Sequence, residues 1–182
     1  MDNGASSYRR FLDGDDSGIV EIIRDYKDGL IFFLNRYVNN IHTAEELTEE
    51  TFFRVVTRKP KFSGRCSFKT WLYTIGRNTA VNFIKRDGRT IPILDEDMFE
   101  AEDTLEKLYL QKEQSTAIHH ALARLRTDYA GVLHLKFFED MDNEQIARIM
   151  KKNKRQIENL IYQAKRAMRA ELDKEGFNYE GL

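Results

Sequence analysis

Near its C-terminal end the chain reads MKKNKRQIENLIYQAKR, residues 150–166, a basic run with regularly spaced apolar residues. The apolar residues recur at helical spacing and mark the side that packs on a core, namely Ile157, Leu160, Ile161, Ala164 and Met168. Arginine can bond bidentately to guanine, Asn and Gln can bond to adenine, and lysines just before a helix suit phosphates. The residues left outside the apolar side have this base-reading chemistry: Lys152, Lys154, Arg155, Gln156, Asn159, Tyr162, Gln163 and Arg166.

A second candidate surface is the run SGRCSFKTWLYTIGRNTAVNFIKR, residues 63–86, where aromatic residues are interleaved with basic and amide ones. This mixture suits separated nucleic-acid strands, because bases stack on aromatic rings while Lys and Arg follow the backbone. The aromatic spacing also fits one buried helix face, so we expect most of the aromatic surface in a core. Arg77, Asn78 and Lys85 lie away from that face and are the better candidates for contact.

Four carboxylates on one predicted helix could instead suggest a metal or acid–base site: Glu45, Glu46, Glu49 and Glu50. They lie on adjacent stripes without a histidine at ligand spacing, which favours a solvated or partner-facing surface. The adjacent His119 and His120 diverge on a helix, and no glycine-rich phosphate loop or nucleophile elbow occurs. We therefore expect no enzyme, no metal and no cofactor.

The charges are strongly segregated although the net charge is only −1. Residues 54–89 hold ten Lys or Arg against one acid, residues 95–106 hold seven acids and no base, and residues 148–169 hold eight bases against one acid. This order suits two modules that face a polyanion, joined by an acidic connector. Solvated helix faces would give a similar pattern, so charge alone does not decide between the two.

No segment alternates as a strand does, so we expect an all-α chain with two small helical domains joined by an acidic linker. In the first domain a helix is capped by Asp16 or Ser17, a second begins at a Thr43–Glu46 capping box, and a third is capped by Ser67. In the second, apolar periodicity continues to Phe137 and a helix-turn-helix follows. The expected bounds are a tail over 1–14, domains over 15–88 and 114–175, a linker over 89–113 and a tail over 176–182.

Nothing in the sequence indicates a membrane span or an oxidising compartment. The longest apolar run, residues 30–34, is far shorter than the roughly 20 residues that cross a bilayer. The first residues lack the apolar core of a signal peptide, and the single Cys66 cannot form an internal disulfide. We expect a cytoplasmic protein.

Three motifs in a fixed order resemble the extracytoplasmic-function (ECF) group of bacterial sigma-70 transcription initiation factors. They are TAEELTEETFFR at 43–54, FSGRCSFKTWLYTIGRN at 62–78, and the helix-turn-helix at 142–169. The resemblance implies sigma regions 2 and 4, with core RNA polymerase (clamp and flap), promoter DNA and an anti-sigma factor as partners. It also implies that the acidic linker runs through polymerase channels that otherwise hold nucleic acid.

The resemblance assigns a role to each motif. The first would bind core polymerase through Glu45, Glu46, Leu47, Glu50 and Phe53. The second would melt and read the −10 promoter element through Gly64, Arg65, Ser67, Lys69, Arg77, Asn78, Asn82, Lys85 and Arg86. The third would read the −35 element through the outward residues of the basic helix, with Arg155 and Gln156 governing sequence choice.

The chain departs from the family pattern at several positions. Lys151 stands where many members have glycine, Asn82 where an acid is common, and Glu158 would face a cytosine or pair within its helix. A different class also fits the helix-turn-helix: a stand-alone regulator with residues 15–88 as a sensor or dimerisation domain. Such a regulator would bind duplex operator DNA without polymerase.

Overall fold

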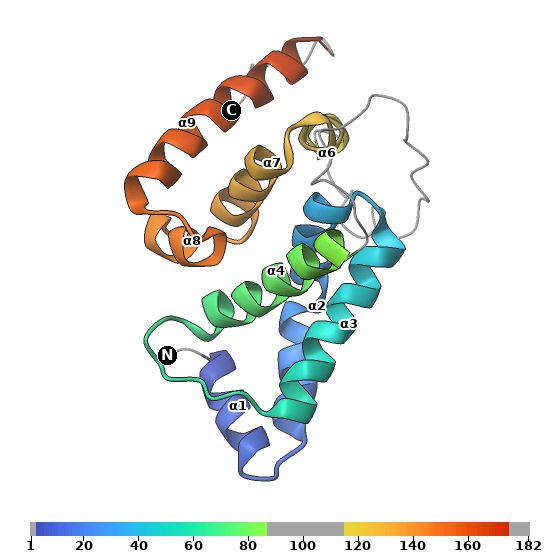
Figure 1. The fold of residues 1–182 in the computed structure, drawn as a ribbon, viewed down its shortest axis with the longest axis vertical. Coiled ribbons are helices and arrows are strands. Elements are labelled where there is room, and N and C mark those ends of the chain that lie inside the picture. The colour runs from blue at the N-terminus through green and yellow to red at the C-terminus, as the bar shows by residue number, and fades with distance from the viewer. Residues whose placement is uncertain (1–2, 87–114, 175–182) are drawn as a thin grey trace.

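The computed structural model describes residues 3–86 and 115–174 of the chain, and every regular element in these ranges is a helix (Figure 1). The first half comprises α1 (Asn3–Leu12), α2 (Ser17–Val38), α3 (Ile41–Arg58) and α4 (Phe68–Arg86). The second comprises α6 (Ser115–Arg124), α7 (Thr127–Leu133), the π-helix η1 (His134–Phe138), α8 (Asn143–Met150) and α9 (Lys154–Lys174). The all-α prediction is confirmed, while the predicted linker at 89–113 and tail at 176–182 lie outside the described residues.

Helix α4 lies in the middle of the molecule, with α2 and α3 on one side and α8 on the other (Figure 1). Helix α7 also contacts α2. Buried side chains of the two halves form one continuous core, to which α2 contributes Leu34 and Tyr37 and α7 contributes Ala130 and Leu133. The two helical halves therefore pack on each other directly.

The first 14 residues are not a tail, because most of them form α1. Tyr8 and Phe11 of this helix are buried, and the Tyr8 hydroxyl donates a hydrogen bond of 2.7 Å to the backbone oxygen of Pro60. Gly18 allows α1 to approach α2, since a Cβ there would lie 2.9 Å from the backbone nitrogen of Phe11. Most residues of α1 are polar and its buried stripe is short, so the sequence analysis predicted a tail here and not a helix.

The N-terminus of α3 is capped differently from the prediction. Asn40, in an extended conformation, accepts a hydrogen bond of 2.9 Å from the backbone nitrogen of Thr43, so the helix already begins at Ile41. The predicted Thr43–Glu46 capping box is therefore wrong, because both residues lie inside the helix. The preceding helix ends as expected near Asn39, which adopts a left-handed conformation with φ 47°.

The predicted apolar periodicity holds through Leu135, which is fully buried, and fails at Phe137, inside the π-helix. The backbone nitrogen of Glu139 bonds to the oxygen of His134 at 3.1 Å, five residues back, so the register shifts by one residue. As a result Phe137, expected in the core, is 56% exposed, whereas His134 is only 4% exposed. The shift places a histidine ring at the contact between the two halves.

Candidate nucleic-acid interface

The helix-turn-helix is built by two reciprocal caps and a tight turn. The Asp142 carboxylate accepts from the backbone of Gln145 at 2.8 Å, and the Gln145 side chain accepts from the backbone of Asp142 at 2.9 Å. At the other end of α8, Lys151 has φ 55°, the left-handed conformation in which glycine carries no Cβ penalty. Lysine adopts this conformation at a cost that glycine would not carry.

The turn leads into α9, whose first turn has a second reciprocal cap. Asn153 Oδ1 accepts from the backbone of Gln156 at 2.8 Å, and Gln156 Oε1 accepts from the backbone of Asn153 at 2.9 Å. Gln156 is exposed, but its carbonyl oxygen is already used within the helix. A bidentate contact with adenine requires both the oxygen and the nitrogen of the amide, so it would cost this cap.

The other predicted −35 residues lie along the outer face of α9. Ile157, Ala164 and Leu172 anchor the opposite side in the core. The exposed residues of the predicted set are Lys154, Arg155, Gln156, Asn159, Tyr162, Gln163 and Arg166, with Lys152 half-buried beside them. Glu158 is exposed on the same side and, among the described residues, pairs with no neighbouring Lys or Arg. It is available to a partner.

A shallow groove of about 180 Å³ runs between α7 and α9. Lys152, Gln156, Asn159 and Gln163 line one side of it, and Tyr129 of α7 lies on the other. Three predicted −35 residues, Gln156, Asn159 and Gln163, therefore share one stripe of α9 beside an aromatic ring, and Lys152 lies in the turn before the helix. Arg155, Tyr162 and Arg166 form the neighbouring stripe, where the Arg166 guanidinium lies 6.0 Å from the centre of the Tyr162 ring.

In the first half, the large aromatic residues of segment 63–86 are mostly core, as predicted. Phe68 is fully buried, and its ring lies 5.2 Å from that of Trp71 and 5.6 Å from that of Phe62. Ser67 caps α4 as predicted, since its hydroxyl accepts from the backbone of Thr70 at 3.2 Å. Gly64, in the loop before this cap, has φ 70°, which favours glycine.

The polar residues that we predict to contact the −10 element divide into three groups. Asn82, Lys85 and Arg86 are exposed on the last turns of α4, and Asn78 is half-buried. Arg77 lies inward, with its guanidinium 5.8 Å from the centre of the Tyr37 ring. Burial raises the pKa of the Tyr37 hydroxyl, an effect that the Arg77 charge opposes only in part.

The third group, Arg65, Ser67 and Lys69, touches the C-terminal half. Lys69 forms an ion pair of 2.7 Å with Glu139, whose side chain is only 10% exposed. Burial raises the pKa of Glu139, but the His134 ring and the Lys69 ammonium outweigh it and lower the pKa to about 2. Burial also lowers the pKa of His134, so this ring is neutral at pH 7. Sequence reasoning missed Glu139 and His134, because no local pattern reports a contact across 70 residues.

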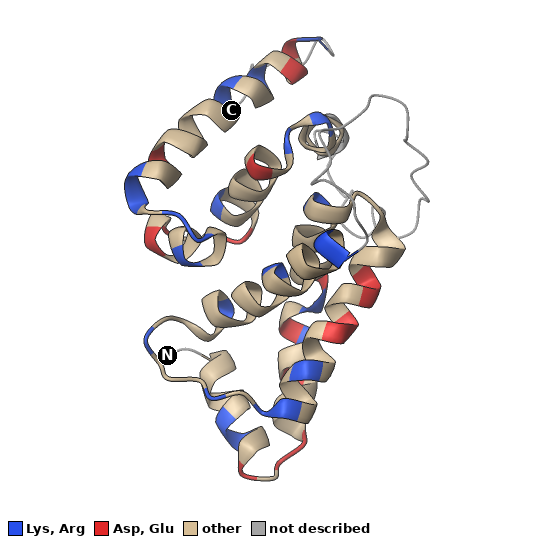
Figure 2. Ribbon diagram, viewed as in Figure 1, with Lys and Arg blue, Asp and Glu red and all other residues tan. Residues whose placement is uncertain are grey.

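The predicted polymerase-binding residues lie on α3, where Figure 2 shows acidic residues gathered along one side. Glu46 is exposed, Glu45 and Glu50 are half-buried, and Phe53 is 67% exposed. Leu47 is only 3% exposed, so it holds α3 against the core and does not reach a partner directly. An exposed aromatic ring beside carboxylates is suited to protein contact.

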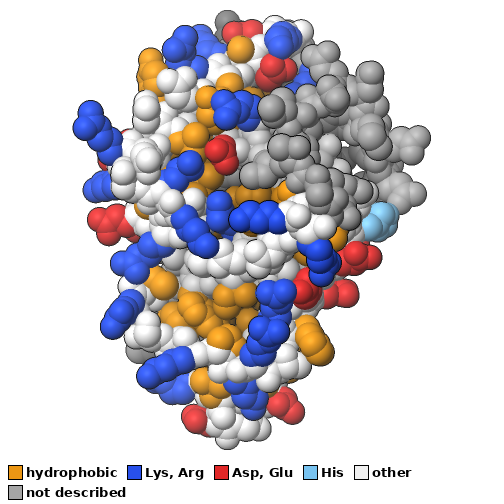
Figure 3. Space-filling view, in the orientation of Figure 1, with side chains coloured by type: hydrophobic (Ala, Val, Ile, Leu, Met, Phe, Trp, Pro, Cys, Tyr) orange, Lys and Arg blue, Asp and Glu red, His pale blue; other side chains and the backbone are white. Residues whose placement is uncertain are grey.

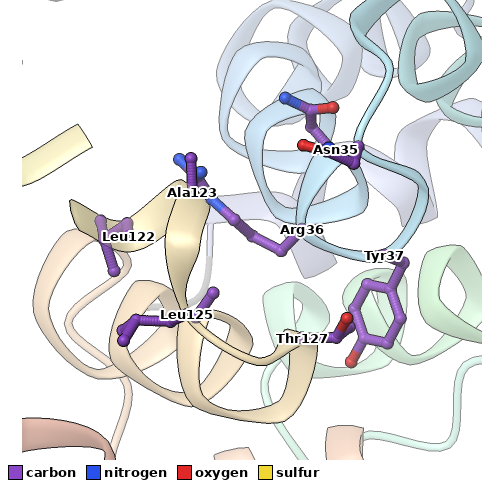
Figure 4. A pocket seen from close by; sticks show the side chains of 9 residues that line it. Asn35, Arg36, Tyr37, Leu122, Ala123, Leu125 and Thr127 are labelled. Carbon is purple, nitrogen blue, oxygen red and sulfur yellow. The ribbon is translucent and has the colours of Figure 1, made fainter. Parts of the chain in front are cut away.

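Lys and Arg side chains are spread over the face that includes α4, α8 and α9, between hydrophobic and other polar side chains (Figure 3). A small cavity of about 20 Å³ lies between the end of α2 and the junction of α6 and α7, lined by Tyr37, Leu122 and Thr127 among others (Figure 4). Room for about one water excludes a nucleotide or cofactor there. No described helix is long and apolar enough to span a bilayer.

Both halves of the chain match known family regions. Residues 22–90 match the sigma-70 region 2 family, and residues 115–168 match the sigma-70 region 4 family. The chain is also similar to curated proteins along most of its length. It is 25% identical to RNA polymerase sigma factor YlaC of Bacillus subtilis (strain 168), over 86% of this chain and 92% of that protein. It is 29% identical to RNA polymerase sigma factor SigV of the same strain, with the same coverage.

Two solved structures share the fold at low sequence identity. CnrH in complex with the cytosolic domain of CnrY has a TM-score of 0.65 and 16% identity, and the match covers 94% of this chain and 96% of CnrH. RpoE in complex with the anti-sigma factor NepR from Bartonella quintana has a TM-score of 0.63 and 17% identity, over 84% of this chain and 95% of RpoE. These likenesses concern the fold.

Proposed function

Because the chain belongs to the ECF group of the sigma-70 family, it is an alternative sigma factor, and we propose which of its residues perform each step of promoter recognition. It binds core RNA polymerase and directs promoter-specific initiation by recognising −10 and −35 elements and melting the −10 element. The observation that carries this proposal is the order of surfaces along the chain. An acidic helix with an exposed Phe53 is followed by a basic loop and helix, and then by a capped helix-turn-helix. The stand-alone regulator is disfavoured, because residues 22–90 match sigma region 2.

The outer face of α9 reads the −35 element in the major groove. Arg155 and Asn159 are exposed in its first two turns, where a recognition helix contacts base edges. Lys152 and Lys154 flank the N-terminus of the helix and bind phosphates. Gln156 contributes chiefly through its free amide nitrogen, because its oxygen caps the helix.

The loop and helix at 64–86 hold the melted −10 strand. Arg65 and Lys69 provide positive charge near the loop, and Asn82, Lys85 and Arg86 provide an exposed polar row at the end of α4. Arg77 does not reach the strand directly but packs beneath this surface, because its guanidinium lies over the Tyr37 ring. Core polymerase binds α3 through Glu46, Glu50 and Phe53, with Glu45 beside them. The buried Leu47 packs α3 against the core and so holds these residues in place.

The factor acts in the cytoplasm and performs no catalysis of its own. The described helices include no membrane span, and polymerase supplies the chemistry of RNA synthesis. An anti-sigma factor is a fitting partner, because the structurally similar RpoE is in complex with the anti-sigma factor NepR, and CnrH is in complex with the cytosolic domain of CnrY.

Run-off transcription tests the proposal. Core polymerase with this chain should give promoter-specific transcripts from a promoter library, and core polymerase alone should give none.

Arg155→Ala should change which promoters are used. Lys165→Ala is the matched control, because Lys165 is a basic residue of α9 whose ammonium lies 5.1 Å from the centre of the Phe137 ring, outside the proposed set. Absence of specific transcripts with the unmodified chain would contradict the proposed function.

A further inference from the structure

One acid lies among the residues of α9 that we propose to read the −35 element. Glu158 stands three residues after Arg155 and directly before Asn159, and all three side chains are exposed. Residues three and four apart lie side by side on a helix, so Glu158 adjoins both Arg155 and Tyr162. The carboxylate therefore belongs to the surface that enters the major groove, although no contact has yet been assigned to it.

The Glu158 carboxylate is not neutralised by any described residue. Lys154 and Arg155 precede it by four and three residues, which is the spacing of helical ion pairs, yet neither pairs with it. The intrahelical pair that the sequence leaves open is thus not formed. Its two oxygens also accept no hydrogen bond from the described part of the chain. Glu158 therefore meets DNA as a charged hydrogen-bond acceptor.

A carboxylate in the major groove is unfavourable unless a base donates a hydrogen bond to it. Duplex DNA carries one negative charge per about 1.7 Å of its axis, so the phosphates repel Glu158. Guanine and thymine present acceptors in the major groove, and adenine presents its donor next to an acceptor. Cytosine alone presents a donor, the N4 amino group, without an acceptor. Cytosine is therefore the base that best offsets the repulsion.

The residue two positions earlier does not compete for this role. Gln156 has the amide that could read adenine, but its oxygen accepts a hydrogen bond of 2.9 Å from the backbone nitrogen of Asn153. The Arg155 guanidinium makes no ion pair with a described residue and suits guanine. The start of α9 thus offers a donor group for guanine and an acceptor group for cytosine.

From these observations we propose that Glu158 is a specificity-determining residue, which selects cytosine at one position of the −35 element by accepting a hydrogen bond from its N4 amino group. Any other base at that position leaves the carboxylate facing an acceptor. Lys152 and Lys154, at the start of the helix, supply the attraction to phosphates that brings an acid into the groove. The inference rests on the proposed function, because it concerns the same −35 surface.

Selection from a random duplex library by polymerase holoenzyme tests the proposal. Core polymerase assembled with the full chain selects duplexes whose −35 region is randomised, and sequencing gives the base preference at each position. The unmodified factor should prefer cytosine at one position by about tenfold, as expected for one base contact. Glu158→Ala should show no preference at that position. Glu158→Gln should replace cytosine with adenine there, because an amide both accepts and donates.

Asp173→Asn is the matched control, because it removes the same charge from an exposed residue of α9 about four turns further along the helix. Both Asp173→Asn and Glu158→Gln should raise the general affinity for DNA by removing a negative charge. Only Glu158→Gln should change the selected base. Because Glu158 is exposed, circular dichroism should show that its variants keep the helical content and thermal midpoint of the unmodified chain.

An unchanged cytosine preference in both Glu158 variants would overturn the proposal, as would the same change of base in Asp173→Asn. A preference lost at every −35 position would also overturn it, because it would indicate a structural role for Glu158. These results leave the proposed function intact, since the unmodified holoenzyme still selects a sequence. A holoenzyme that selects no sequence with the unmodified factor would overturn the proposed function and this inference together.

Discussion

At the scale of single residues, Gln156 shows how one side chain can be exposed and yet structurally engaged. Its position on the outer face of α9 predicts base reading, but its oxygen completes the helix cap with Asn153. Arg155 is the neighbouring exposed residue, and its guanidinium makes no hydrogen bond or ion pair with any described residue. The two neighbours should therefore respond differently to substitution.

Gln156→Ala should lower the free energy of unfolding by about 1 kcal/mol, because it removes the reciprocal cap. Gln156→Glu should restore most of that stability, since a carboxylate accepts the same bond and suits a helix N-terminus. Arg155→Ala should leave stability unchanged and reduce discrimination at one −35 base pair by about 1–3 kcal/mol. Urea denaturation and binding of polymerase holoenzyme to −35 variants measure these effects. A stability loss with Arg155→Ala equal to that with Gln156→Ala would contradict the assignment.

The buried titratable groups predict loss of stability in acid. The pKa of His119 is lowered to about 4, chiefly by burial, and that of Glu139 is lowered to about 2. The free energy of unfolding should thus begin to fall below about pH 6.5, because His119 takes up a proton in the unfolded chain but not yet in the folded one. It should fall again between about pH 4.5 and 2, where Glu139 is protonated in the unfolded chain but not in the folded one. Each group adds a slope of at most about 1.4 kcal/mol per pH unit.

Urea denaturation across this pH range, with Glu139→Gln as the comparison, checks the prediction. The variant should lose part of the dependence between about pH 4.5 and 2, because Asp15 and Glu21 also have lowered pKa values, and it should keep the dependence above about pH 4.5. An unchanged acid slope in the variant would show that other carboxylates dominate.

At the scale of elements, the turn between α8 and α9 sets the angle at which the recognition helix is presented. The turn depends on the left-handed Lys151 and on the bond of 3.0 Å from the Lys152 backbone to the Ala147 oxygen. The pattern of the sequence predicts both helices and the turn. It does not predict the reciprocal cap of α9, because Asn153 and Gln156 were assigned to the polar turn and to base reading.

Lys151→Gly should stabilise the protein by about 1 kcal/mol, because glycine adopts the left-handed conformation without a Cβ penalty. Lys152→Gly is the control, since Lys152 is not among the residues with positive φ and glycine there adds only freedom to the unfolded chain. Thermal unfolding followed by circular dichroism should show a higher midpoint for the first variant and a lower one for the second. Equal midpoints would indicate that the turn carries no conformational strain.

At the scale of the whole molecule, the two halves behave as one body in the described structure. Their buried residues form one core, and the Lys69–Glu139 pair closes the contact at the edge of α4. Two domains on either side of a linker would be expected to unfold independently. A shared core couples them instead.

Unfolding in urea should therefore be a single transition. The only tryptophan, Trp71, reports the first half, and circular dichroism reports helices of both halves. The two signals should coincide in the unmodified chain and separate in Glu139→Gln, where the contact between halves is weakened by a few kcal/mol. Transitions that are already separate in the unmodified chain would contradict the shared core.

The sequence by itself determined the all-α class, most helix positions, the helix-turn-helix and the family, because these depend on local periodicity, caps and ordered motifs. Only the tertiary structure decided which candidate residues are accessible. In the structure Leu47 is buried, the Arg77 guanidinium lies over the Tyr37 ring, α1 packs on the core, and Lys69 forms an ion pair with Glu139. The physical reason is that accessibility and charge pairing depend on contacts between residues far apart in the chain, and that the π-helix changes the register locally, where Phe137 is exposed.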